Sequence, residues 1–156
     1  MSTVIEKDLS FLWPPFADKI KLMQKDFLAH TGQALHVFET WRPHYRQNFL
    51  YEQGRTRAGK QVTQVRGWQS FHQYGLACDF IVDQDPKQEG IQRPYDAGVD
   101  WPYLGELAKK YDLEWGGFWK IKDLSHVQVK TDLKAFDLLA VERNSGLLEV
   151  WKQIRI

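Results

Sequence analysis

The spacing of apolar positions predicts both helices and strands along the chain. Between positions 15 and 31, apolar side chains recur every three or four residues, as on one face of a helix, and Gly32 can supply the left-handed residue that ends it. Segment 34–40 alternates like a half-buried strand, 76–82 is an apolar run typical of a central strand, and 126–129 is expected to be a short strand. Further helices are expected at 43–53, 100–111, 132–143 and 145–156.

The remaining segments are rich in glycine, proline and polar residues and are expected to be irregular. They are 55–70, 83–99 and a turn or hairpin at 115–119. No repeat, low-complexity linker or change of composition divides the chain, so a single domain is expected. Because the strands do not alternate regularly with the helices, the predicted class is α+β, with a small antiparallel sheet flanked by helices.

The composition is that of a packed domain without a strong charge bias. Of the 156 residues, 43% are hydrophobic and 14% are aromatic. A chain of this length can bury about two thirds of its unfolded surface. The 21 basic and 20 acidic residues leave a formal net charge of +1, which argues against nucleic acid as a partner.

Neither a membrane span nor a disulfide framework is expected. No run approaches the ~20 apolar residues of a spanning helix, and positions 1–8 lack the pattern of a secretory signal. Synthesis in the cytoplasm, without membrane insertion, is therefore expected. Cys78 is the single cysteine and is interpreted as a small buried hydrophobe rather than a metal ligand.

Two histidines and two aspartates supply the groups that metal-assisted hydrolysis requires. His72, Asp79 and His126 can be the three protein ligands of a catalytic zinc ion, which keeps a fourth position open for water. Asp123 can accept and return a proton. On one continuous strand, the spacing of His72 and Asp79 would place them on opposite faces. We therefore expect His72 on a loop, a bend at Gly75 and Asp79 on a strand, with His126 on the neighbouring strand.

These residues belong to a pattern of three motifs. The motifs are Ser70-x-His72-x-x-Gly75-x-Ala77-x-Asp79, Trp115-Gly116-Gly117 and Asp123-x-x-His126-x-Gln128. Together they resemble the family of zinc D-Ala-D-Ala carboxypeptidases and L-alanyl-D-glutamate endopeptidases, which cut the peptide stems of bacterial peptidoglycan and include bacteriophage endolysins. Upstream, Trp41-Arg42-Pro43 and segment 47–56 are similar to an arginine-containing segment of the endolysin branch. Val127 and Trp68 depart from the family pattern and bear on the shape of the substrate groove.

The resemblance implies a fold of the Hedgehog/D,D-peptidase type and Zn²⁺ as the cofactor. His72, Asp79 and His126 would be the zinc ligands. Asp123 would be the catalytic base, and Arg42 matches the arginine that binds and polarises the substrate carbonyl. The residues that would line or brace the substrate site are Ser70, Gln47, Arg55 and Trp115.

Peptidoglycan stem peptides are the substrate that the resemblance implies. The expectation is a monomer, one zinc peptidase domain over residues 1–156 without a separate wall-binding module, acting in the periplasm or cell wall after release from the cytoplasm. Two reactions remain open. One is endopeptidase cleavage between L-Ala and D-Glu, favoured because the absent signal sequence suits an endolysin; the other is removal of a terminal D-Ala by a carboxypeptidase or dipeptidase.

Two alternatives from other classes remain. Two histidines and one carboxylate also suit non-haem iron oxygenases, but these commonly place the first histidine two residues from the carboxylate, and no such pair occurs here. The second alternative is a non-catalytic zinc-binding domain. Asp123 argues against it, because a structural site needs no base and usually has four protein ligands, often cysteines.

Overall fold

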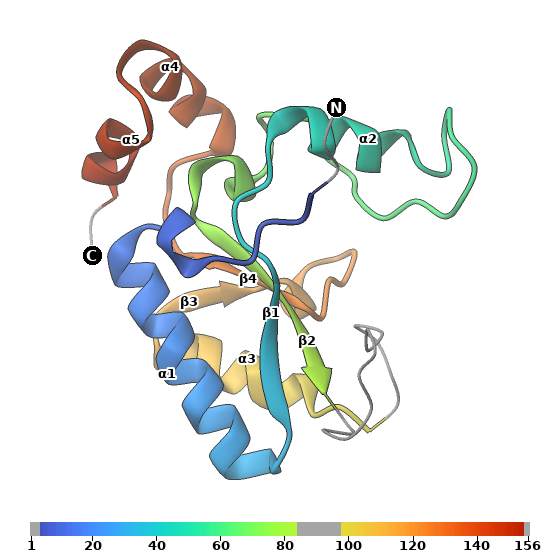
Figure 1. The fold of residues 1–156 in the computed structure, drawn as a ribbon, viewed down its shortest axis with the longest axis vertical. Coiled ribbons are helices and arrows are strands. Elements are labelled where there is room, and N and C mark those ends of the chain that lie inside the picture. The colour runs from blue at the N-terminus through green and yellow to red at the C-terminus, as the bar shows by residue number, and fades with distance from the viewer. Residues whose placement is uncertain (1–3, 84–97, 155–156) are drawn as a thin grey trace.

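The computed structural model describes residues 4–83 and 98–154, and the described part is built on a four-stranded antiparallel sheet (Figure 1). The strand order is β1-β2-β4-β3, with β1 at Ala34–Glu39, β2 at Ala77–Asp83, β4 at His126–Val129 and β3 at Leu113–Trp115. β2 and β4 are therefore the two central strands. The predicted α+β class with a small antiparallel sheet is confirmed.

β3 is the strand that the apolar pattern does not predict. It has three residues and pairs with β4, with Leu113 opposite Val129 and Trp115 opposite Val127. So short a strand has no alternation long enough to detect, and it forms because β4 offers it a partner. The expected turn after it is present as η3, a 3-10 helix at Gly116–Phe118.

Helices α1, at Pro14–Thr31, and α3, at Trp101–Lys110, pack against each other and against the sheet (Figure 1). Their buried side chains join those of the strands in one hydrophobic core. Because side chains alternate along a strand, Cys78 and Phe80 of β2 point into this core, and Asp79 between them points to the opposite face. This alternation directs the Asp79 carboxylate away from the core.

The C-terminal end of α1 and the N-terminal end of α3 form as the sequence predicts. Gly32 adopts φ +71° and its N–H bonds to the carbonyl oxygen of Leu28, which ends α1. At the start of α3, the Asp100 side chain accepts a hydrogen bond from the Tyr103 N–H at 3.0 Å.

The other helices differ from the predicted ranges at their ends. Helix α2 spans His44–Glu52, α4 spans Ala135–Ser145 and α5 spans Leu147–Gln153. The helix expected from position 132 begins at Ala135, where the Asp137 carboxylate accepts the N–H of Lys134 at 3.1 Å. Gly146, at φ +80°, separates α4 from α5, two to three residues after the predicted boundary.

Segment 55–70 is irregular apart from short turns, as predicted. Of the irregular segment expected at 83–99, positions 84–97 lie outside the described residues, as do 155–156 of the last predicted helix. Within the described ranges, no helix combines the length and the apolar character needed to cross a membrane.

Candidate metal centre

His72 is held in a tight turn that leads into β2. The turn is η2, a 3-10 helix at Phe71–Tyr74, and the hydroxyl of Ser70 caps it by accepting the His72 N–H at 3.3 Å. Gly75 ends the turn at φ +66°, and a Cβ there would lie 2.5 Å from the carbonyl oxygen of Phe11. Only glycine fits both requirements. The bend predicted at Gly75 is confirmed.

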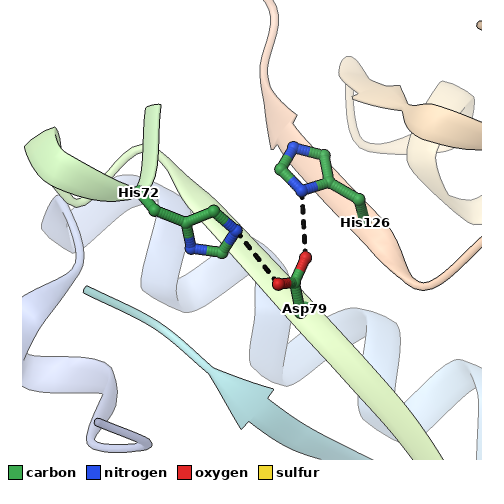
Figure 2. Close-up of side chains that lie close together, drawn as sticks. All are labelled: His72, Asp79 and His126. Carbon is green, nitrogen blue, oxygen red and sulfur yellow. Dashed lines mark hydrogen bonds and ion pairs between the residues drawn. The ribbon is translucent and has the colours of Figure 1, made fainter. Parts of the chain in front are cut away.

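Asp79 and His126 reach the same place from the two central strands. Their Cα atoms are direct partners in the β2–β4 pair, so both side chains lie on one face of the sheet. Asp79 Oδ1 is 2.9 Å from His126 Nδ1, and Asp79 Oδ2 is 3.2 Å from His72 Nε2. Figure 2 shows the carboxylate between the two imidazoles. The structure thus brings together the three side chains that the sequence singles out.

The tautomer of His72 follows from its backbone contact. Nδ1 lies 2.6 Å from the carbonyl oxygen of Thr40, and because a carbonyl oxygen only accepts, Nδ1 carries the proton. When the ring is neutral, Nε2 holds a lone pair. This atom is buried and has no hydrogen bond within the described part of the chain, although Asp79 Oδ2 is 3.2 Å away. Leaving a buried acceptor without a donor is costly, so the arrangement suits a cation at this position.

Asp79 is in the state that metal binding requires. Burial raises the pKa of Asp79, but the two imidazoles and the charge of Arg42 outweigh burial and hold that pKa well below its ordinary value. A carboxylate must be ionised to act as a ligand.

The donor atoms also lie close to one another. Within residues 4–83 and 98–154, one group offers three possible ligand atoms that all lie within 4.8 Å of one another, namely His72, Asp79 and His126. Ligand atoms that share a zinc ion stand about 3 to 4 Å apart, because each lies about 2.1 Å from it. The group is therefore a possible site for a divalent cation.

Gln128 orients the second imidazole and is a supporting residue that the sequence analysis does not assign. Its Oε1 lies 3.0 Å from His126 Nε2. Burial lowers the pKa of His126, but the hydrogen bond and charge of Asp79, with Asp123 and Gln128, raise it overall above the ordinary value. A cation at Nδ1 would therefore displace a proton, while Nε2–H would stay on Gln128. Its place in the third motif is the one sequence signal for Gln128.

Arg42 and Gln47 lie directly beside this group. Arg42 Nη2 donates to Asp79 Oδ2 at 2.6 Å, and Arg42 Nη1 donates to Gln47 Oε1 at 2.9 Å. Gln47 is fully buried and its Nε2 donates to the carbonyl oxygen of Val65 at 2.9 Å. Gln47 therefore braces Arg42 and ties the irregular segment to the site, rather than facing solvent.

Asp123 lies on the turn that precedes β4. It is half-buried, and it accepts a hydrogen bond from the Ser125 hydroxyl at 3.1 Å. Its backbone N–H donates to Gly116 at 3.0 Å, and a Cβ on Gly116 would come within 2.5 Å of the Asp123 carbonyl oxygen and 3.3 Å of His126 Cβ. The Trp-Gly-Gly motif therefore has a packing reason: Gly116 lets the predicted base lie next to a predicted ligand.

Three other residues expected at the substrate site have structural contacts of their own. Ser70 caps the turn that carries His72. Arg55 donates to the carbonyl oxygens of Tyr51 and Thr63, at 2.6 and 3.1 Å, and so holds the irregular segment together. Trp115 is 6% exposed and lies in the core, with its Nε1 donating to Leu124. Substrate contact by any of the three stays a prediction.

Trp119 is the aromatic residue that lies against the centre. Its ring is 4.9 Å from the His126 ring and is half-buried. The sequence places Trp119 in the predicted turn at 115–119 but does not distinguish it from Trp115. The structure distinguishes them, because Trp115 belongs to β3 and faces the core, whereas Trp119 follows η3 and covers the imidazole.

Comparison with known proteins confirms the predicted resemblance. Residues 63–129, which contain His72, Asp79, Asp123 and His126, match the model of a family described as D-alanyl-D-alanine carboxypeptidase. The chain is 38% identical over 106 residues to the peptidoglycan L-alanyl-D-glutamate endopeptidase CwlK of Bacillus subtilis (strain 168), an alignment that covers 65% of this chain. The chain spans 64% of the length of that relative.

A solved structure has the same fold. The crystal structure of Serratia marcescens L-Ala D-Glu endopeptidase ChiX superposes with a TM-score of 0.51 and covers 83% of this chain and 92% of that chain. The two sequences are 20% identical in this comparison, so this likeness supports the fold alone.

Proposed function

Because residues 63–129 of this chain match the D-alanyl-D-alanine carboxypeptidase family, we propose that the protein is a zinc-dependent peptidase of peptidoglycan stem peptides. The observation that carries the proposal is the convergence of His72, Asp79 and His126, with His72 Nε2 buried and without a hydrogen bond in the described part of the chain. A structural role alone would not explain a buried ring nitrogen that has no hydrogen-bond partner on an imidazole held by a backbone contact.

The three converging side chains fit zinc better than other common cations. Imidazole nitrogen with one carboxylate is a usual zinc donor set, whereas Mg²⁺ and Ca²⁺ favour oxygen ligands. His72 would bind through Nε2, Asp79 through a carboxylate oxygen and His126 through Nδ1. Zinc in such a site supplies Lewis acidity and lowers the pKa of a water molecule to about 7.

The remaining groups have roles that their positions support. Asp123, next to His126, would accept a proton from the attacking water and deliver it to the leaving amine. Arg42, whose Nη2 is 2.6 Å from Asp79, is close enough to the ligand group to stabilise negative charge that develops on the substrate carbonyl. Trp119 would form one wall beside the imidazole.

Endopeptidase cleavage between L-Ala and D-Glu is the reaction we favour. The support is the name of the 38% identical relative, an L-alanyl-D-glutamate endopeptidase. Removal of a terminal D-Ala is the second candidate, because the matching family is described as D-alanyl-D-alanine carboxypeptidase. On either reading, the place of action is where peptidoglycan is found, in the periplasm or cell wall.

Digestion of purified peptidoglycan, followed by mass analysis of the fragments, tests the proposal. New N-terminal D-Glu is the expected product of the endopeptidase, and free D-Ala would indicate the carboxypeptidase. Activity should disappear with a chelator and return with added zinc. If a folded, zinc-loaded chain releases no fragment, the protein is not a peptidase of this substrate. The alternative of a non-catalytic zinc-binding domain would then be favoured.

A further inference from the structure

Glu39 is a buried carboxylate next to the metal centre that the proposed mechanism does not use. It is 1% exposed and lies at the end of β1. Each of its oxygens meets a different arginine: Oε2 accepts from Arg42 Nε at 2.7 Å, and Oε1 accepts from Arg46 Nε at 2.5 Å. Both arginines are 8% exposed, so the three groups form a buried ionic cluster.

The sheet register places Glu39 directly opposite Asp79. The two residues are Cα partners in the β1–β2 pair, at a point where an irregularity between Val37 and Glu39 shifts the register. Like charges at paired positions destabilise a sheet, and an irregularity of this kind re-aims a side chain. The repulsion between Glu39 and Asp79 must therefore be offset by a nearby positive charge.

Arg42 lies between these two carboxylates. Its Nη2 is 2.6 Å from Glu39 Oε2 and also 2.6 Å from Asp79 Oδ2. One guanidinium charge is thus shared by two carboxylates, while Arg46 supplies the charge that completes the neutralisation of Glu39. The four charges of Glu39, Asp79, Arg42 and Arg46 sum to zero. Asp79, however, is paired with an Arg42 charge that it shares with Glu39.

This sharing has a consequence for a cation at Asp79. A guanidinium paired with Asp79 alone would compete with the cation for the same carboxylate charge. With Glu39 drawing on Arg42 from the other side, Asp79 keeps more of its negative charge. The contact to Oδ2 also limits rotation of the carboxylate, as supporting hydrogen bonds do for metal ligands.

We propose that Glu39 is a positioning residue of the metal centre, which acts through Arg42 to fix the Asp79 carboxylate and to keep it negative enough to hold a divalent cation. The inference rests on the proposed function, since it concerns the same site. It adds a residue outside the matching segment 63–129 and outside the three motifs.

The test compares Glu39→Gln with the matched control Glu52→Gln. Glu52 forms a Glu–Arg pair of similar length with Arg57, at 2.5 Å, but the two side chains are 40% and 53% exposed, and Glu52 is the last residue of α2. Zinc affinity is measured by competition with a chromogenic chelator, and the absorption spectrum of the Co²⁺-substituted protein reports the ligand geometry. Glu39→Gln should bind zinc about 10- to 100-fold more weakly, with an altered Co²⁺ spectrum, whereas Glu52→Gln should match the wild type.

An unchanged zinc affinity and Co²⁺ spectrum in folded Glu39→Gln would overturn the inference, even with a lower melting temperature, because only a structural role would remain. Should Glu39→Gln fail to fold, the double variant Glu39→Gln/Arg46→Gln keeps the cluster electrically balanced and must show the same weakening of zinc binding. The wild type is measured first. If it binds no zinc, both the proposed function and this inference fail; if it binds zinc and cuts peptidoglycan while Glu39→Gln is unaltered, only the inference fails.

Discussion

Asp79 and His126 are cross-strand partners on the two central strands, and the carboxylate Oδ1 of one lies 2.9 Å from the imidazole Nδ1 of the other. The pairing is set by backbone hydrogen bonds between β2 and β4, so the distance between the two side chains is built into the sheet. His72 is added from a capped turn whose end is fixed by Gly75. A rigid sheet carrying two of the three groups is a suitable support for a metal centre.

Replacing His126 with alanine should abolish tight metal binding. The variant removes one nitrogen of the three-residue group and leaves Asp79 without its 2.9 Å partner. Elemental analysis after gel filtration should fall from about one zinc per chain to a small fraction of that. The matched control is His36→Ala on β1, which is exposed and should keep the wild-type zinc content. Retention of one tightly held zinc in His126→Ala would remove this residue from the ligand set.

Asp123→Ala should separate catalysis from metal binding. Asp123 is not one of the three converging groups, so the variant should fold and bind zinc as the wild type does. Its turnover of peptidoglycan should fall at least about 100-fold, the usual scale for loss of a general base. Asp132→Ala, at an exposed position between β4 and α4, is the control and should be fully active. Near-normal turnover by Asp123→Ala would exclude it as the base.

Gly116→Ala should damage the site by a steric clash alone. The new Cβ would meet the Asp123 carbonyl oxygen at 2.5 Å, so the turn that holds Asp123 has to move. Displacement of a catalytic group by about 1 Å can cost about 100-fold in rate, and a loss between tenfold and that value is expected. Gly59→Ala is the control, since its Cβ would have no neighbour within 4 Å; the φ of +116° at this exposed position disfavours alanine, so the variant should lose some stability but keep its activity. Equal activities in the two variants would show that the close approach at Gly116 is unimportant.

The hydrogen bond from Trp151 Nε1 to the carbonyl oxygen of Tyr74, at 2.8 Å, ties α5 to the turn that carries His72. Trp151→Phe removes this bond and keeps an aromatic ring, so the free energy of unfolding should fall by about 1 kcal/mol. Urea denaturation monitored by circular dichroism measures the change. Leu148→Ala on the same helix is 69% exposed and should change stability by less than about 0.5 kcal/mol. If both variants match the wild type, α5 does not support the turn.

Asp26 links α1 to the end of α3 and should make the stability of the fold depend on pH in the acidic range. Its carboxylate accepts hydrogen bonds from Lys110 Nζ at 2.6 Å and from the Tyr111 hydroxyl at 2.7 Å, and these lower the pKa of Asp26. Because that pKa is lower in the folded state, the contribution to stability is present above the unfolded value near 3.8 and is lost as the pH falls through the folded value.

Thermal melts of the wild type and Asp26→Asn at about pH 6 and about pH 3 test this linkage. The melting temperature of the wild type should fall further on acidification than that of Asp26→Asn, because the variant has no carboxylate to protonate at position 26. Asp18→Asn, which removes the exposed pair with Lys21 within α1, is the control and should follow the wild type. An equal fall in melting temperature on acidification in all three proteins would contradict the linkage.

The local sequence predicts those features that depend on a few neighbouring residues. The alternation in β2 sets Asp79 on the face opposite Cys78 and Phe80, and Gly75 marks the bend that brings His72 back toward that face. The three motifs also predict the resemblance to the family of peptidoglycan peptidases, which the comparisons with known proteins confirm. Short-range patterns are enough here because strand alternation and a glycine bend act within a few bonds.

Contacts across the sheet are decided by the tertiary structure. Nothing in the sequence near Glu39 shows that it faces Asp79 across the β1–β2 pair, that Arg42 lies between them, or that Trp119 rather than Trp115 covers His126. The pairing of Glu39 with Asp79 depends on strand register, and a shift of one residue would turn the side chain to the other face. Arg42 and Trp119 lie outside the strands, and their places depend on how the segments after β1 and η3 fold. The sequence by itself therefore determined which side chains could bind a cation, and the folded sheet decided which buried charges surround them.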